Sequence, residues 1–209
     1  MNGELRERLG KLDKNYDGKA FREIISQIKR ERINDNGLLV LVENISLKRF
    51  KETVSFTISV PVGNLLEAVL TIATLVLAFQ INSNWMLYIS ALVLMATLHS
   101  LSHYITGALA GIRFSHYYLN GPARIEPTLR IDFSSYLKAP GKKRALMHLS
   151  GVVGTVAAPL IVAVIALDKG ASVAAVNLFY LFLLLIVFEL LTSTKIGDLM
   201  KAKREYGYR

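Results

Sequence analysis

The chain has 209 residues, of which 52% are hydrophobic, and a formal net charge of +9. It contains no cysteine, which excludes disulfides, cysteine-ligated zinc and cysteine nucleophiles. The apolar residues form long runs and the basic residues lie outside them, which is typical of a membrane protein and argues against a nucleic-acid partner. The sequence therefore predicts a mainly α-helical membrane protein that crosses the bilayer several times. The lipid bilayer is then its expected surroundings and partner.

Residues 1–60 form a polar, basic region that opens on a charged segment instead of a signal peptide. Apolar residues from Phe21 onward recur at helical spacing, so we predict an amphipathic helix over 18–33. Short apolar or alternating runs predict strands over 38–42 and 54–60. We therefore expect a small cytoplasmic α/β region that lies against the membrane surface.

Four apolar segments follow, and each approaches the roughly 20 residues that cross a bilayer as a helix. They occupy residues 62–79, 85–107, 146–167 and 173–191. The connections 80–84 and 168–172 are so short that we expect hairpin turns between antiparallel helices. The chain then divides into the N-terminal region, 1–60, and a four-helix transmembrane domain, 61–209.

The distribution of basic residues predicts the orientation of these helices. Lysine and arginine are concentrated before residue 62, in the loop 112–145 and after residue 192, whereas the connections 80–84 and 168–172 contain only Lys169. Cytoplasmic segments of membrane proteins carry an excess of lysine and arginine. We therefore predict that both termini and the long loop lie in the cytoplasm.

The loop 112–145 contains two strand-like runs, one that begins at residue 112 and one over 125–133. Asn120-Gly121 lies between them, and this dipeptide is a strong turn signal between two strands. We predict a β-hairpin. Because its runs are apolar, we expect the hairpin to be associated with the membrane face or with the helices.

Two histidines, His99 and His103, stand four residues apart in the second apolar segment. Residues i and i+4 lie on one face of a helix, where two imidazoles can bind one metal ion. With the predicted topology, Glu67, His148 and Asp198 fall in the same layer, roughly 10 to 15 Å thick, near the cytoplasmic face. Ionisable residues at such depths are costly and usually functional. The alternative is that both histidines are structural and hydrogen-bond neighbouring helices.

Residues 85–205 resemble the core of the site-2 protease family of intramembrane zinc metalloproteases. In that family, one transmembrane helix carries the motif H-E-x-x-H, and a later helix carries the aspartate that is the third zinc ligand. His99-Ser-Leu-Ser-His103 stands where H-E-x-x-H belongs. Ser150-Gly-Val-Val-Gly-Thr-Val-Ala-Ala-Pro159 resembles the small-residue helix between them, and Ile196-Gly-Asp-Leu199 stands near the aspartate motif.

The resemblance implies that zinc is bound by His99, His103 and Asp198. It also implies a change in chemistry, because Ser100 replaces the glutamate that is the general base of the family. A serine hydroxyl is too weakly basic for this role, and losing a general base costs about 10²–10⁴-fold in rate. The segment before the aspartate departs as well, since Thr192-Ser-Thr-Lys195 replaces an asparagine and prolines.

Three interpretations stay open. The first is a pseudoprotease that keeps the zinc site and binds or regulates transmembrane clients. The second is an active intramembrane zinc metalloprotease in which Glu67, on the first apolar segment, acts as the base in place of Ser100. The third is a non-enzymatic scaffold or complex subunit with structural histidines, which docks a partner subunit or a second copy of the chain.

Overall fold

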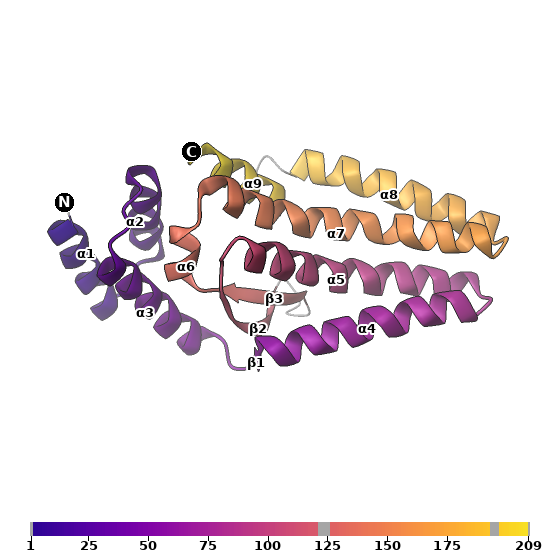
Figure 1. Ribbon diagram of the computed structural model, residues 1–209, viewed down its shortest axis with the longest axis horizontal. Helices are drawn as coiled ribbons and strands as arrows, with labels where there is room; N and C mark the ends of the chain where they lie inside the picture. The colour runs from indigo at the N-terminus through magenta and orange to yellow at the C-terminus, as the bar shows by residue number, and fades with distance from the viewer. Residues whose placement is uncertain (1, 121–125, 193–196, 209) are drawn as a thin grey trace.

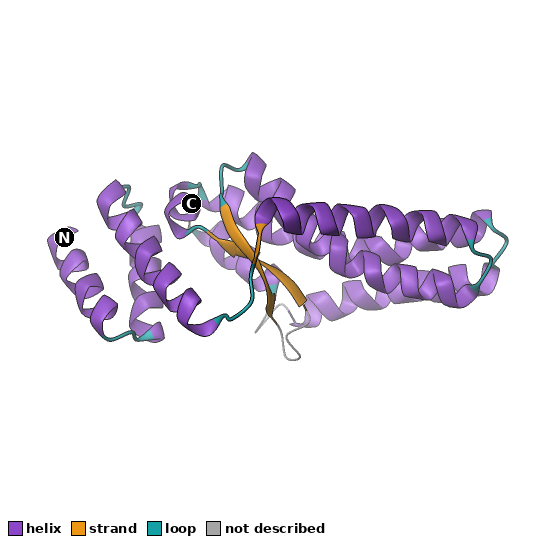
Figure 2. Ribbon diagram, turned by 90° about the horizontal axis from the view of Figure 1, so that it is seen from below, coloured by secondary structure: helices purple, strands orange, loops and turns teal. Residues whose placement is uncertain are grey.

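The computed structural model describes residues 2–120, 126–192 and 197–208. Three short helices form one end of the molecule, four long helices form the other, and a small sheet lies between them (Figures 1 and 2). The helices are α1 (Asn2–Lys14), α2 (Gly18–Glu31), α3 (Asn36–Thr53), α4 (Val60–Gln80), α5 (Asn84–Leu109), α6 (Phe133–Lys138), α7 (Gly141–Asp168), α8 (Ser172–Thr192) and α9 (Asp198–Gly207). The strands are β1 (Ile58–Ser59), β2 (Phe114–Asn120) and β3 (Glu126–Ile131).

The helices α4, α5, α7 and α8 are each long and apolar enough to cross a membrane. They confirm the four apolar helices that the sequence predicts. Many of their large apolar side chains are exposed, among them Leu66, Val153 and Leu184. Soluble monomers rarely expose apolar surface over whole helices.

The N-terminal region is helical up to Thr53, so the predicted strand at 38–42 is wrong. These residues lie in α3, where Leu38, Leu39 and Val42 are buried against the other N-terminal helices. Asp35 caps the helix by accepting a hydrogen bond from the Leu38 N–H at 3.0 Å. The cap and the i, i+4 burial favour a helix over a strand.

The helix predicted at 18–33 is confirmed as α2. It begins after Asp17, which caps it, and it buries Phe21, Ile24 and Ile28. The second predicted strand, 54–60, is present only as the two-residue strand β1, because Val60 already begins α4. The expected α/β region is therefore a three-helix unit followed by one short strand.

The predicted hairpin is confirmed as β2 and β3, which pair antiparallel with Tyr117 opposite Leu129. The predicted turn at Asn120-Gly121 lies at the edge of the described residues, since residues 121–125 fall outside them. The strand order is β1-β2-β3, and β3 packs against α5. The hairpin thus lies beside the helix that carries the two histidines.

The helices α5 and α7 approach each other closely because α7 has glycine at the contact. A β-carbon built at Gly154 would lie 2.5 Å from the Leu98 carbonyl oxygen, and one built at Gly151 would collide with the His103 ring. The small-residue segment predicted at 150–159 is therefore the surface on which the His103 side chain rests.

Candidate metal centre

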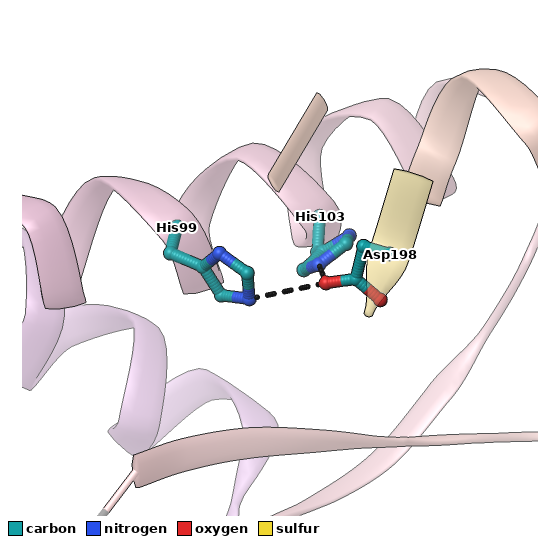
Figure 3. Close-up of side chains that lie close together, drawn as sticks. All are labelled: His99, His103 and Asp198. Carbon is teal, nitrogen blue, oxygen red and sulfur yellow. Dashed lines mark hydrogen bonds and ion pairs between the residues drawn. The ribbon is translucent and has the colours of Figure 1, made fainter. Parts of the chain in front are cut away.

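The His99 and His103 side chains lie on one face of α5, with ring centroids 4.6 Å apart. Asp198, the first residue of α9, directs one carboxylate oxygen at both rings (Figure 3). That oxygen, Oδ2, is 3.0 Å from His103 Nε2 and 3.4 Å from His99 Nε2. One donor atom from each of the three residues lies within 4.8 Å of the other two. The structure thus brings together the three residues predicted as ligands.

The other ring nitrogen of each histidine is hydrogen-bonded to α7. His103 Nδ1 lies 2.7 Å from the Met147 carbonyl oxygen, which can only accept, so Nδ1 carries the proton. His99 Nδ1 lies 2.9 Å from the Thr155 hydroxyl oxygen. The Thr155 hydroxyl donates to the Gly151 carbonyl, so its oxygen accepts from the His99 Nδ1–H. Both histidines therefore carry a proton on Nδ1.

When both imidazoles are neutral, both Nε2 atoms present lone pairs to Asp198; when one is an imidazolium, its Nε2–H donates to the Asp198 carboxylate. Lone pairs repel a carboxylate oxygen at 3.0 and 3.4 Å unless a cation lies among them. A tetrahedral zinc ion with bonds near 2.0 Å separates its donors by about 3.3 Å. Two imidazoles and a carboxylate form a common zinc donor set, and hydrogen bonds to the opposite ring nitrogen are the usual support of metal-binding histidines. The arrangement therefore fits zinc.

The second oxygen of Asp198 faces other groups. Oδ1 lies 2.8 Å from the Lys201 ammonium and 3.6 Å from His148 Nδ1. Burial alone would raise the pKa of Asp198, but the contacts with His103, His148 and Lys201 hold it well below its usual range. Asp198 is therefore a carboxylate. The sequence places His148 in the same polar layer but does not indicate this contact.

A buried ion cluster holds α9 in place. Glu205 is fully buried and accepts from Lys29 of α2 at 2.5 Å and from Arg144 of α7 at 2.7 Å. It follows Asp198 by seven residues, which is two helical turns, so both carboxylates lie on one side of α9. Burial opposes ionisation of Glu205, but the adjoining Lys29 and Arg144 keep its pKa below the usual range. Lys29, Arg144 and Glu205 therefore hold the helix that carries Asp198, the third candidate ligand.

Ser100 is buried, and its hydroxyl makes hydrogen bonds to backbone carbonyl groups. Its hydroxyl donates to the Pro127 carbonyl of β3 at 3.1 Å, so it ties the hairpin to α5. A cavity of about 290 Å³ lies between these elements and is lined by Ser100, the three predicted ligands and residues of β3. The position at which the resemblance expects a glutamate thus holds a serine whose hydroxyl is hydrogen-bonded at the wall of the cavity.

Glu67, the base that the sequence suggests, and Glu126, a carboxylate beside the candidate ligands, lie in different places. Glu67 is buried in α4, and one of its carboxylate oxygens has no hydrogen-bond partner among the described residues. It is not among the residues that line the cavities beside His99. Glu126 of β3 lines both of these cavities together with His99 and Asp198. The sequence analysis missed Glu126 because a residue at the start of a hairpin strand has no periodic signal.

The connection before Asp198 is where the sequence departs most from the site-2 protease pattern. Residues 193–196, which include most of that departure, lie outside the described part of the chain. Gly197 has φ +104°, a conformation that glycine adopts readily, and α9 begins directly after it. The reversed order Gly197-Asp198 therefore makes the aspartate the first residue of a helix.

No protein-family model, curated protein or solved structure matches the chain.

Glu205→Gln tests how α9 is held. The substitution leaves Lys29 and Arg144 buried without their carboxylate, which costs about 3–5 kcal/mol. We expect a lower thermal midpoint in detergent and a zinc affinity reduced about 10–100-fold, because a supporting contact of the ligand is lost. Glu7→Gln, which removes an exposed ion pair with Lys11 on α1, is the control and leaves both quantities unchanged. Parental zinc affinity in Glu205→Gln contradicts the positioning role.

Proposed function

We propose that the protein is a multi-pass membrane metalloprotein of the site-2 protease type that binds zinc through His99, His103 and Asp198. It acts as a pseudoprotease, which binds or regulates transmembrane clients without cleaving them efficiently. The single observation that carries the proposal is the Asp198 oxygen shared by two Nε2 atoms whose tautomers expose lone pairs. A zinc ion among these three atoms would offset the repulsion between them.

Three features support the membrane part of the proposal. The four long helices have the length and apolar surface that a bilayer requires. The basic residues predict that both termini and the hairpin loop lie on the cytoplasmic side. His103 is six residues from the end of α5, so it lies about 9 Å from that end along the helix axis. With that orientation, the candidate ligands would lie at the cytoplasmic end of the bundle, next to β3.

The residues around the proposed zinc site have separate roles. Zinc held by two histidines and an aspartate supplies Lewis acidity to a carbonyl or a water molecule. Met147 and Thr155 keep the two Nε2 atoms available for the metal, and Lys201 keeps Asp198 ionised. Ser100 cannot accept a proton from water, and its own proton is donated to the Pro127 carbonyl. Metal binding is therefore expected without efficient peptide hydrolysis.

A second candidate function is an active protease with a relocated base. Glu126 favours this candidate because it lines the same cavity as His99 and Asp198. Glu67 is the base suggested by sequence depth, but it does not line that cavity. The third candidate, a scaffold with structural histidines, requires that a proton on one imidazole takes the place of the metal ion.

The zinc content of the purified protein tests the proposal. We expect about one zinc per chain in the parent and none in the His99→Ala/His103→Ala variant, measured by elemental analysis after detergent purification and dialysis. His116→Ala is the matched control because His116 lies on β2 and is not among the three ligands. It keeps the metal. Equal zinc in the parent and the double variant, or zinc in neither, contradicts the proposal and favours the scaffold.

Ser100→Glu tests whether the missing base accounts for inactivity. A carboxylate at the family position is expected to raise zinc-dependent cleavage of a reconstituted transmembrane peptide by about 10²-fold or more, measured by mass spectrometry of the products. Ser100→Gln, which has a similar size and no base, stays inactive.

Efficient, zinc-dependent cleavage by the parent contradicts the pseudoprotease assignment and favours the second candidate. Glu126→Gln and Glu67→Gln then identify the base, because only the variant that lacks it loses turnover. Zinc binding is retained in both.

A further inference from the structure

A second cavity, of about 440 Å³, lies where α2, α6 and the start of α7 meet. Figure 1 shows these three elements together at the junction of the short and long helices. Among the described residues that line it, five are basic and none is acidic. The basic residues are Lys29, Arg32, Lys138, Lys142 and Arg144. The cavity is distinct from the metal centre and shares none of the predicted ligands.

The inner wall of this cavity has an excess of buried positive charge. The Lys29 and Arg144 side chains are 6% and 4% exposed, and both pair with the one carboxylate of Glu205. Arg204 lies 3.8 Å from the same carboxylate. Burial outweighs the attraction of Glu205 and lowers the pKa of Lys29, as expected for an ammonium that is incompletely neutralised. An anion in the cavity would balance this charge.

The outer wall adds two exposed lysines and the start of a long helix. Lys138 ends α6 and Lys142 lies in the first turn of α7, and neither has an acidic partner within the described ranges. Pro140, which precedes α7, has no side-chain polar group that could accept hydrogen bonds from the first turn. The N-terminus of a helix favours anions, because its first N–H groups point away from the helix and the positive end of the helix dipole lies there. The outer wall therefore attracts the same charge as the inner wall.

The depth of the cavity indicates the source of the anion. The helix α7 has 28 residues, so it is about 42 Å long, whereas the hydrocarbon core of a bilayer is about 30 Å thick. The predicted apolar segment of α7 begins at residue 146, which places Lys142 about 6 Å outside it. Phospholipid headgroups occupy this level. Basic pockets at the cytoplasmic ends of membrane helices bind such headgroups.

We propose that this cavity binds the phosphate group of an anionic phospholipid. Arginine and lysine both recognise phosphate oxygens with charge-assisted hydrogen bonds. A phosphate seated here would contact α2 and α7 at once, so it would hold the N-terminal helices against the membrane domain. The inference rests on the membrane topology proposed above and does not depend on zinc.

Native mass spectrometry of the full-length protein in detergent tests the proposal, with phosphatidic acid as the probe and phosphatidylcholine as the zwitterionic reference. Lys138→Gln/Lys142→Gln is expected to weaken phosphatidic acid binding about 25-fold, about fivefold for each lysine. The matched control is Lys143→Gln/Lys203→Gln, which removes two exposed lysines near the cavity that do not line it. It binds phosphatidic acid like the parent. Lys138→Arg/Lys142→Arg keeps the charges and restores binding.

Three results would overturn the proposal. Equal weakening in the test and control pairs would mean that surface charge acts without a site. Equal binding of phosphatidylcholine would remove the need for an anionic headgroup. Displacement of the lipid by inorganic phosphate at the same concentration would assign the cavity to free phosphate. The test pair should bind zinc like the parent, so a failure here is distinguishable from a failure of the metal site.

Discussion

One oxygen of Asp198 faces the Nε2 atoms of both His99 and His103, and the surrounding structure serves to keep it there. Without a cation, the three groups would repel one another, because two lone pairs and a carboxylate would meet in a partly buried site. The helix α5 supplies both imidazoles. The helix α7 fixes their tautomers through Met147 and Thr155. Each element near the site thus contributes to a geometry that is favourable only with a positive charge at its centre.

Asp198, the third candidate ligand, comes from a part of the chain that contacts the N-terminal region through α2. The helix α9 carries Asp198 at its start and Glu205 two turns later, and Glu205 is paired with Lys29 of α2 and Arg144 of α7. A fully buried carboxylate is stable only with such partners. Docking of α9 therefore requires both the N-terminal region and the start of α7. The three N-terminal helices belong to the support of the site, although the sequence separates them from it.

The sequence predicted the parts of the structure that depend on local pattern. Long apolar runs predicted four helices, because a run of about 20 apolar residues is the length that crosses a bilayer. The four-residue spacing predicted the two histidines on one face. The strand predicted at 38–42 was wrong, because a short apolar run does not distinguish a strand from a buried helix, and the capping role of Asp35 was overlooked.

The contacts that the sequence could not predict join distant positions. Lys29 and Glu205 are 176 residues apart, and no periodicity indicates that they meet. Glu126 reaches the cavity through the pairing of β3 with β2, and Ser100 acquires its partner Pro127 in the same way. The candidate ligands were found because the motif and the resemblance named them. Their support was not found, because it depends on tertiary packing.

X-ray absorption at the zinc edge reports which atoms bind the metal in the protein loaded with one equivalent of zinc. We expect two imidazole ligands with bonds of about 2.0–2.1 Å and a carboxylate oxygen at a similar distance. Asp198→Asn should alter the oxygen shell and keep both imidazoles. A spectrum with oxygen ligands alone, or one that is identical in the His99→Ala/His103→Ala variant, would contradict the claim that these two histidines and Asp198 share a metal ion.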